Sequence, residues 1–393
     1  MRRVDSRWVA LALIFVTRTS MGVQFQSIAS VGPLLVADLG LSYAQVGTLI
    51  GLYLLPGVAL SLPGGLIGQR FGDRRAVVCG LAAMVVGGLL TAWSDGFVGA
   101  AAGRLLSGGG AVLMNILLIK MTADWFAGRE MATAMAAVLT AWPVGLGLAA
   151  ATLGALATAT SWRIALVVAA ATAALGLVLM AAVFREVPER AACARSALGA
   201  RDLGLTVASG AAWGVFFASL AAVIAFGPPM LVARGASLGQ AGFEVSLAIW
   251  VTIVSVPLGG LLSDRMGRPN AFIVVGSLGG AGLLWALPTM PAAALGLVLV
   301  GTVIGAAPGP LTSLLPRALA PERLAGGLGV SYTVYYLVMA AVQPVAGLLR
   351  DRTGDPATPV RFAAVAMATT VVGLAAFRLI ARRAAATSRS TRP

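Results

Sequence analysis

The feature that most constrains this chain is an internal repeat. Residues 30–72 align with residues 225–267 without a gap, at a constant offset of 195 positions (225 − 30). In so apolar a chain, chance would mainly align Ala, Leu and Val, so matched Gly, Pro and polar residues indicate two copies of one unit. The matched pairs include Gly32-Pro33 with Gly227-Pro228, Ser42 with Ser237, Gln45 with Gln240, Gly64-Gly65-Leu66 with Gly259-Gly260-Leu261, and Arg70 with Arg265.

The composition places both copies in a lipid bilayer. Hydrophobic residues make up 59% of the chain and charged residues 11%, with a mean hydropathy of +0.92. A soluble domain is far less apolar. The 28 basic residues are scattered between apolar runs, which is not the pattern of a nucleic-acid-binding surface. The runs predict about twelve transmembrane helices. These cover residues 8–37, 45–68, 76–94, 97–121, 131–156, 162–184, 204–232, 239–262, 270–288, 292–318, 323–349 and 359–381.

The helices divide into two groups of six. One sizeable polar connection, residues 185–202, separates an N-terminal bundle, residues 1–184, from a C-terminal bundle with a short tail, residues 203–393. The expected fold is therefore all-α and integral to the membrane, with two pseudosymmetric six-helix bundles. Membrane proteins built in this way usually bind a ligand between the halves, where one half can move against the other.

The basic residues predict the orientation. If the N-terminus is inside, 21 basic residues fall on the cytoplasmic side and five on the other, with Arg18 and Arg104 inside spans. Both termini are then cytoplasmic by the positive-inside rule. The run after Met1 has no convincing cleavage site, which indicates an uncleaved first helix in a multi-pass plasma-membrane protein.

Several chemistries are disfavoured. The chain has no histidine, and its two cysteines, Cys79 and Cys193, both fall on the predicted cytoplasmic side. A zinc site, a structural disulfide and histidine-based catalysis are therefore not expected. No catalytic constellation points to an enzyme, and the short termini disfavour a membrane sensor, which usually carries a signalling extension. We expect no metal and no cofactor.

Two matching loops carry a family resemblance. The segments Gly65–Gly72 and Gly260–Arg268 each connect two helices on the predicted cytoplasmic side. They resemble the major facilitator superfamily signature Gly-x-Leu-x-Asp-Arg-x-Gly-Arg, although Gln69 replaces the acidic residue in the first copy. The resemblance implies a monomeric secondary transporter that works by alternating access, in which the acidic residue helps to latch the cytoplasmic gate. The gating candidates are Gln69, Arg70, Asp264, Arg265 and Arg268.

A second match lies in the fourth span. Arg104-Leu105-Leu106-Ser107-Gly108-Gly109-Gly110 resembles the family pattern Arg-x-x-x-Gly-x-Gly. An arginine within a span is costly unless it is paired or faces a polar cavity. The resemblance implies a role in proton movement in some members, and a packing role fits Arg104 equally well. We therefore count Arg104 among the coupling candidates.

Arg18 is the main candidate for substrate binding. At about 100° per residue, Phe25 shares its face of the first helix. The repeat offset maps Arg18 to Trp213 and Gly22 to Phe217, so that one half offers a guanidinium at the position where the other offers an aromatic wall. A fixed guanidinium in a partly dehydrated cavity suits a carboxylate or another small planar anion, because its fork can bind two oxygens. Snorkelling, or an ion pair with a neighbouring helix, is the structural alternative.

Other candidates lie on the first and eleventh spans. The stretch from Gln26 to Leu35 resembles the first helix of the cyanate-permease-like and nitroimidazole-permease-like branch, in which an arginine stands near the position of Gln26. This resemblance implies an anionic substrate and adds Gln26 to the site. Tyr332 and Tyr335 are the candidates on the eleventh span, followed by Tyr336 and Gln343, and helix packing alone could also explain these aromatic residues.

These features predict a transporter of a small organic or inorganic anion. No carboxylate lies clearly at the centre of a span, and a cation-binding cavity would need one. Proton-coupled efflux of drugs or other hydrophobic compounds is the alternative, supported by Arg104 and the aromatic residues of the seventh span. A sensor with a transporter fold is a remote third reading. The expected partners are a small-molecule substrate and the bilayer, and not nucleic acid.

Overall fold

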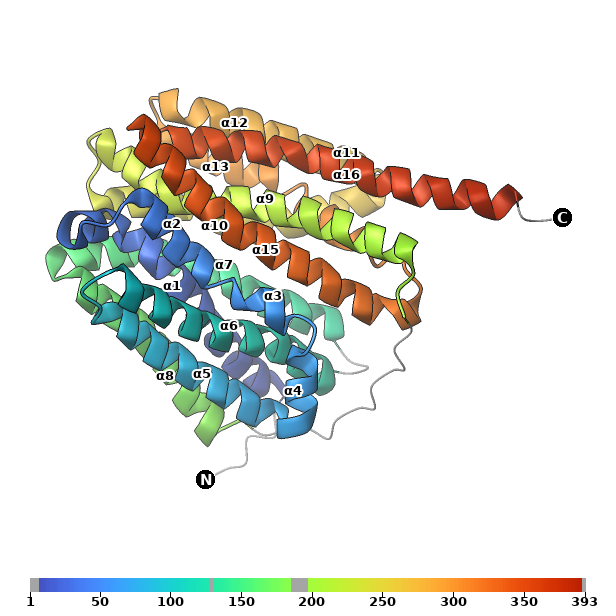
Figure 1. Ribbon diagram of the computed structural model, residues 1–393, viewed down its shortest axis with the longest axis horizontal. Helices are drawn as coiled ribbons and strands as arrows, with labels where there is room; N and C mark the ends of the chain where they lie inside the picture. Colours follow the sequence, from blue (N-terminus) through green and yellow to red (C-terminus); the bar gives the residue numbers. More distant parts are fainter. Residues whose placement is uncertain (1–6, 127–129, 185–196, 391–393) are drawn as a thin grey trace.

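The computed structural model describes residues 7–126, 130–184 and 197–390, and within these residues every regular element is helical. Twelve segments are long and apolar enough to cross a membrane, which confirms the predicted number of spans. Large apolar side chains such as Val98 and Val372 are exposed on the outside of the helices, as expected for surfaces in contact with lipid. The helices form the elongated bundle of Figure 1.

The first six spans comprise eight helical elements. They are α1 (Arg7–Leu39), α2 (Tyr43–Leu52), α3 (Pro56–Leu60), α4 (Gly64–Phe71), α5 (Asp73–Ala92), α6 (Phe97–Trp125), α7 (Met131–Ala159) and α8 (Trp162–Ala182). The last six comprise α9 (Ala200–Ala233), α10 (Leu238–Met266), α11 (Pro269–Val274), η1 (Val275–Gly279), α12 (Gly280–Ala286), η2 (Leu287–Thr289), α13 (Ala293–Ile304), α14 (Pro308–Ser313), α15 (Pro321–Thr353) and α16 (Thr358–Ser390). Helix α9 begins inside the predicted connection 185–202, of which residues 185–196 lie outside the described residues.

Two spans predicted as continuous helices are broken. The second span is interrupted before Pro56 and again near Pro63, and the tenth span is interrupted before Pro308. Proline has no backbone N–H to donate and its ring clashes with the preceding turn, so the helical hydrogen bonding is interrupted there. The break before Pro56 is important because Gly57, which follows it, contacts the other group of helices.

The repeat is visible in the helix ends. Helices α2 and α10 begin at Tyr43 and Leu238, which are 195 positions apart (238 − 43), as the alignment predicts. Each start has a complete capping box: Ser42 with Gln45, and Ser237 with Gln240. The serine oxygen accepts the backbone N–H of the glutamine three residues later, and the glutamine oxygen accepts the serine N–H.

Two groups of helices pack side by side. In the first group, α1 lies against α7 and α8, and α5 lies between α6 and α8. In the second group, α9 lies against α15 and α16. Small residues allow close packing: a Cβ atom on Gly145 would lie 2.2 Å from the carbonyl oxygen of Thr19. The main contacts between the groups are α2 with α15 and α7 with α10.

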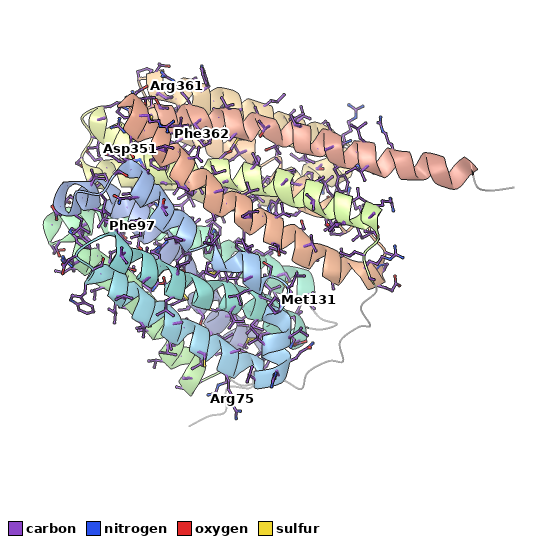
Figure 2. The ribbon with its side chains drawn as sticks, in the orientation of Figure 1. Arg75, Phe97, Met131, Asp351, Arg361 and Phe362 are labelled. Atoms are coloured by element: carbon purple, nitrogen blue, oxygen red, sulfur yellow. The ribbon has the colours of Figure 1, made fainter. Side chains whose placement is uncertain are left out.

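The groups are tightly joined on the side where α1 ends and α2 begins, which we call the Gly40 side. The opposite side, where α1 begins and α16 ends, is the terminal side. A Cβ atom on Gly47 would lie 2.3 Å from the oxygen of Gln343, and one on Gly242 would lie 2.2 Å from the oxygen of Ala150. Figure 2 labels Asp351 at the Gly40 side and Arg75 at the terminal side.

An acidic side chain also crosses between the groups at the Gly40 side. The Asp351 carboxylate, near the end of α15, accepts the backbone N–H of Tyr43 at 2.9 Å and that of Ala44 at 2.7 Å. The first N–H groups of a helix have no partner within the helix, and a negative charge is favourable at this end of α2. Arg350 lies over the Tyr43 ring, 5.1 Å from its centroid. The two side chains of α15 therefore hold the start of α2.

Candidate functional site

Arg18 is a buried cation with unused hydrogen-bond donors. It lies eleven residues after the start of α1, or about 16 Å along the helix axis. Its exposed fraction is 7%, and its Nε and Nη1 atoms are buried without a hydrogen-bond partner. Arg18 interacts electrostatically with the phenol groups of Tyr332 and Tyr336 on α15. Arg18 therefore faces the second group of helices from the first.

Tyr336 fits against the broken second span. A Cβ atom on Gly57 would lie only 2.4 Å from two carbon atoms of the Tyr336 ring, so a side chain at this position would collide with the ring. The Asn115 side chain of α6 interacts electrostatically with the Tyr336 phenol, while the Asn115 Oδ1 atom is buried without a partner. Tyr336 thus packs against α3 and interacts electrostatically with Asn115 and Arg18, all in the first group of helices.

The remaining predicted aromatic residues form one cluster, which we call the aromatic wall: Trp213 and Phe217 of α9 with Tyr332 and Tyr335 of α15. The Trp213 ring lies 4.4 Å from Tyr335 and 4.9 Å from Tyr332, measured between centroids, and Phe217 lies 6.1 Å from Trp213. The Trp213 Nε1 atom is buried without an acceptor. The cluster is apolar on its ring faces and keeps an unused donor.

Phe25 and Gln26 differ in their surroundings. The Phe25 ring packs on Trp142 at 5.4 Å and on Tyr53 at 5.9 Å, both within the first group. Gln26 is 1% exposed, and both of its amide atoms are buried without a partner. Gln343 donates to the carbonyl oxygen of Ala218 at 3.1 Å and keeps a buried, unpartnered Oε1 atom. A buried amide without partners costs free energy unless a ligand or water supplies them.

Arg104 is fully engaged. It donates from Nε to the oxygen of Leu49 at 3.0 Å, from Nη1 to that of Gln24 at 2.8 Å and from Nη2 to that of Phe25 at 3.4 Å. Its guanidinium carbon also lies 4.3 Å from the centroid of the Tyr53 ring. Arg104 therefore holds α1, α2 and α6 together, and its partners are backbone carbonyls and one ring rather than a carboxylate.

The charged loops of the terminal side form ion pairs within each group of helices. Asp264 pairs with Arg317 at 2.8 Å, and both side chains are exposed. In the first group, Asp73 pairs with Lys120 at 3.0 Å. Asp73 stands at the position that the repeat matches to Arg268, so this copy carries its acid four residues after Gln69. Gln69, Arg70, Arg265 and Arg268 are exposed.

Three residues of this arrangement were not among the predicted ones: Asn115, Gly57 and Asp351. Asn115 could have been found, because it is a lone amide within an apolar span. Gly57 and Asp351 have no such signal, because their roles depend on a partner in the other half. Among the described residues, no group of three His, Cys, Asp or Glu side chains could hold a metal ion.

Comparisons with known proteins agree with the fold. The family model described as Major Facilitator Superfamily matches residues 11–341. The 3-(3-hydroxy-phenyl)propionate transporter of Escherichia coli is 28% identical over 395 residues, which cover 95% of this chain and 94% of that protein. The uncharacterized transporter YycB of Bacillus subtilis is 26% identical over 376 residues, 91% of this chain and 90% of its own.

Solved structures show the same architecture. The inward open conformation of the xylose transporter XylE from E. coli superposes with a TM-score of 0.77 at 13% identity, over 93% of this chain and 95% of that one. The apolar spans and these relatives indicate a multi-pass protein of a bacterial inner membrane, with a small molecule as substrate. The chain belongs to the major facilitator superfamily and is a secondary transporter rather than an enzyme.

Proposed function

We propose that this transporter carries a small organic anion and binds its negative group at Arg18. The observation that carries the proposal is a buried guanidinium whose Nε and Nη1 atoms have no partner. An unpaired cation within a span is costly, and a substrate carboxylate would supply both the opposite charge and two acceptor oxygens. Arg104, the other arginine within a span, already has its partners and is not proposed to bind substrate.

The proposed substrate carries an aromatic ring beside its carboxylate. Trp213, Tyr332 and Tyr335 offer ring faces that favour a flat apolar group. The E. coli relative is named for 3-(3-hydroxy-phenyl)propionate, which has both a ring and a carboxylate. The resemblance of the stretch Gln26–Leu35 to the cyanate-permease-like and nitroimidazole-permease-like branch supports an anion but not a ring. We propose the unpartnered amide of Gln26 as the group that binds a polar substituent of the substrate.

A thermal-shift series with matched ligands tests the proposal. 3-Phenylpropionate, 3-phenylpropanamide and 3-phenylpropylamine share one ring and differ in charge. A ligand that binds only the native state raises the melting temperature. Only the anion should stabilise the protein, and Arg18→Ala should abolish the effect, whereas Arg361→Ala, at an ion pair with Asp355 on the Gly40 side, should preserve it. Stabilisation by the amine alone would instead support efflux of hydrophobic cations.

We propose that the transporter works as a monomer by alternating access, with both termini in the cytoplasm. The Gly40 side is then periplasmic. The contacts of Asp351 with Tyr43 and Ala44 support its role as a latch on this side, because they join α15 to α2. The latch must open whenever the site faces outward. Cysteines introduced near Arg190 and near Asp355 should be labelled from opposite sides of the membrane, and labelling of both from the periplasm would exclude this topology.

The charged loops of the terminal side are proposed to act in gating. Gln69, Arg70, Arg265 and Arg268 are exposed there, and Asp264 has a nearby cation in Arg317. Asp264→Asn should slow transport more than Gln69→Asn, because only the first change removes a charge. The transport rate of Asp351→Asn is measured for comparison, because this variant weakens a contact between the two groups of helices on the Gly40 side. Equal transport by Asp264→Asn and Gln69→Asn would mean that the loops only connect helices.

A further inference from the structure

We infer that the transporter is an obligatory anion exchanger. It switches between its inward-facing and outward-facing states only when an anion is bound at Arg18. The inference rests on the proposed function, because it requires an anion at Arg18. It adds a mode of transport: inward movement of one anion is coupled to outward movement of another, without a co-transported proton. We infer exchange without a proton from the distribution of buried charged side chains.

Charged groups are scarce inside the described part of the protein. Three charged side chains are buried there: Arg18, Arg104 and Asp202. Asp202 lies in the first turn of α9 and pairs with Arg323 at 2.9 Å. Arg104 donates to three backbone oxygens and lies over a tyrosine ring. Arg18 is therefore the one buried charge in the described residues that has neither an ion pair nor a hydrogen bond to its Nε and Nη1 atoms.

The described residues include no acid that could replace the substrate at Arg18. With the exception of Glu244, their carboxylates lie within two residues of a helix end or in a connection between helices. The titratable side chains that interact electrostatically with Arg18 are the phenols of Tyr332 and Tyr336, which are neutral groups at pH 7. The whole chain has no histidine, the side chain that most often exchanges protons near neutral pH.

Glu244 is the acidic residue that must be tested as an alternative proton carrier. It lies six residues after the start of α10, or about 9 Å along the helix from the Gly40 side, and its side chain is half-buried. A protonated Glu244 could in principle carry a proton with the substrate. No described contact joins Glu244 to Arg18, so Glu244 is outside the proposed binding site and can be neutralised without changing that site.

The free-energy barrier to reorientation differs between the empty protein and the protein with a bound anion. In alternating access, both sides of the central site are closed for a moment, and the remaining solvent is removed from Arg18. With no anion bound, this state buries a lone cation, which is strongly unfavourable in the core of a membrane protein. With an anion bound, the pair is close to neutral and both partners are hydrogen-bonded. The loaded protein should therefore reorient much faster than the empty one, in both directions.

Reconstituted vesicles separate exchange from net transport. The full-length protein is placed in vesicles that contain either unlabelled 3-phenylpropionate or HEPES buffer alone, with equal pH on both sides and the membrane potential clamped to zero. Uptake of labelled 3-phenylpropionate should be faster into the preloaded vesicles by at least about 100-fold, the factor that matches the lower measured costs of placing an arginine in a membrane core. Preloading with neutral 3-phenylpropanamide should give no acceleration.

The controls distinguish three outcomes. After subtraction of uptake into protein-free vesicles, equal uptake into preloaded and buffer-filled vesicles, or accumulation driven by an acidic exterior in buffer-filled vesicles, would overturn the exchange mechanism while leaving the anion site intact. Exchange should persist unchanged in Glu244→Gln, and its loss there would overturn the inference in favour of proton coupling. Failure of 3-phenylpropionate both to raise the melting temperature and to enter preloaded vesicles would reject the proposed function, and the exchange inference with it.

Discussion

Arg18 and Arg104 lie within the same six-helix group and are buried to a similar extent, but their surroundings differ. Arg104 is 2% exposed and donates to the carbonyl oxygens of Leu49, Gln24 and Phe25. Arg18 is 7% exposed and has two buried nitrogen atoms without a partner. Both sites contain tyrosine rings, but only at Arg18 do those rings belong to the opposite group of helices.

The difference separates a structural cation from a binding cation. The contacts of Arg104 are internal to one group of helices and do not need to change when that group moves. Arg18 faces the boundary between the groups, where contacts must form and break during transport. A buried charge with unused donors is unfavourable by itself and becomes favourable when an anion arrives. Variants of the two arginines should therefore affect different measurable properties.

The largest effect is expected for Arg18→Ala on ligand binding. Removing one partner of a desolvated, hydrogen-bonded charge pair should weaken binding of 3-phenylpropionate by about 2 to 5 kcal/mol. Isothermal titration with the purified protein gives this value. The unfolding free energy should change little or rise, because the variant no longer buries an unpaired cation. Unchanged binding by a folded Arg18→Ala protein would show that the arginine is structural and would favour the efflux alternative.

Arg104→Ala should have the opposite profile. It removes three hydrogen bonds from a charged donor and a cation–π contact with Tyr53, and should lower the unfolding free energy by about 3 kcal/mol. Denaturant titration in detergent, monitored by tryptophan fluorescence, measures this loss. Any binding that remains under native conditions should have nearly normal affinity. If Arg104→Ala were as stable as the parent but unable to bind 3-phenylpropionate, the distinction between the two arginines would fail.

The span pattern and repeat could be predicted from the sequence because they depend on local features. Apolar length defines the spans, and the two Ser/Gln capping boxes fix equivalent helix starts at Tyr43 and Leu238. The partners of Arg104 could not be predicted, because a backbone carbonyl leaves no mark in the side-chain pattern. The breaks at Pro56 and Pro308 were also missed, since hydropathy averages over prolines that interrupt a helix.

The candidate site was predictable only in part. Arg18 stood out because an arginine is costly within a span, and the repeat directed attention to Trp213 and Phe217. The sequence could not show that Arg18 of α1 interacts electrostatically with Tyr336 of α15. Nor could it show that Asp351 holds the start of α2. Both contacts join segments about 300 positions apart in the chain, and they depend on how the two groups dock.

Arg18→Lys sharpens the comparison with a smaller change. It keeps the positive charge but replaces a planar fork with a compact ammonium group, which cannot form two parallel hydrogen bonds to a carboxylate. Binding of 3-phenylpropionate should weaken by about 1 to 2 kcal/mol, less than in Arg18→Ala. The same titration measures it, with Arg361→Lys as the control. Equal affinity of Arg18→Lys and the parent would mean that the cation acts only through its charge.

The smallest effect is expected for Trp213→Ala, and it concerns selectivity rather than charge. Trp213 lies 4.4 Å from Tyr335 and 4.9 Å from Tyr332, so its loss opens the aromatic wall without altering Arg18. A stacked ring contributes about 0.5 to 1.5 kcal/mol beyond its buried area. The preference for 3-phenylpropionate over 3-cyclohexylpropionate should therefore fall by about three- to tenfold, with affinity for the cyclohexyl compound little changed. Trp285→Ala, at an exposed tryptophan of α12, is the matched control and should preserve the preference. Equal losses of affinity for both ligands in Trp213→Ala would mean that the tryptophan supports the fold of the site and does not select an aromatic ring. The contrast between a charged half and an aromatic half would then rest on Arg18 alone.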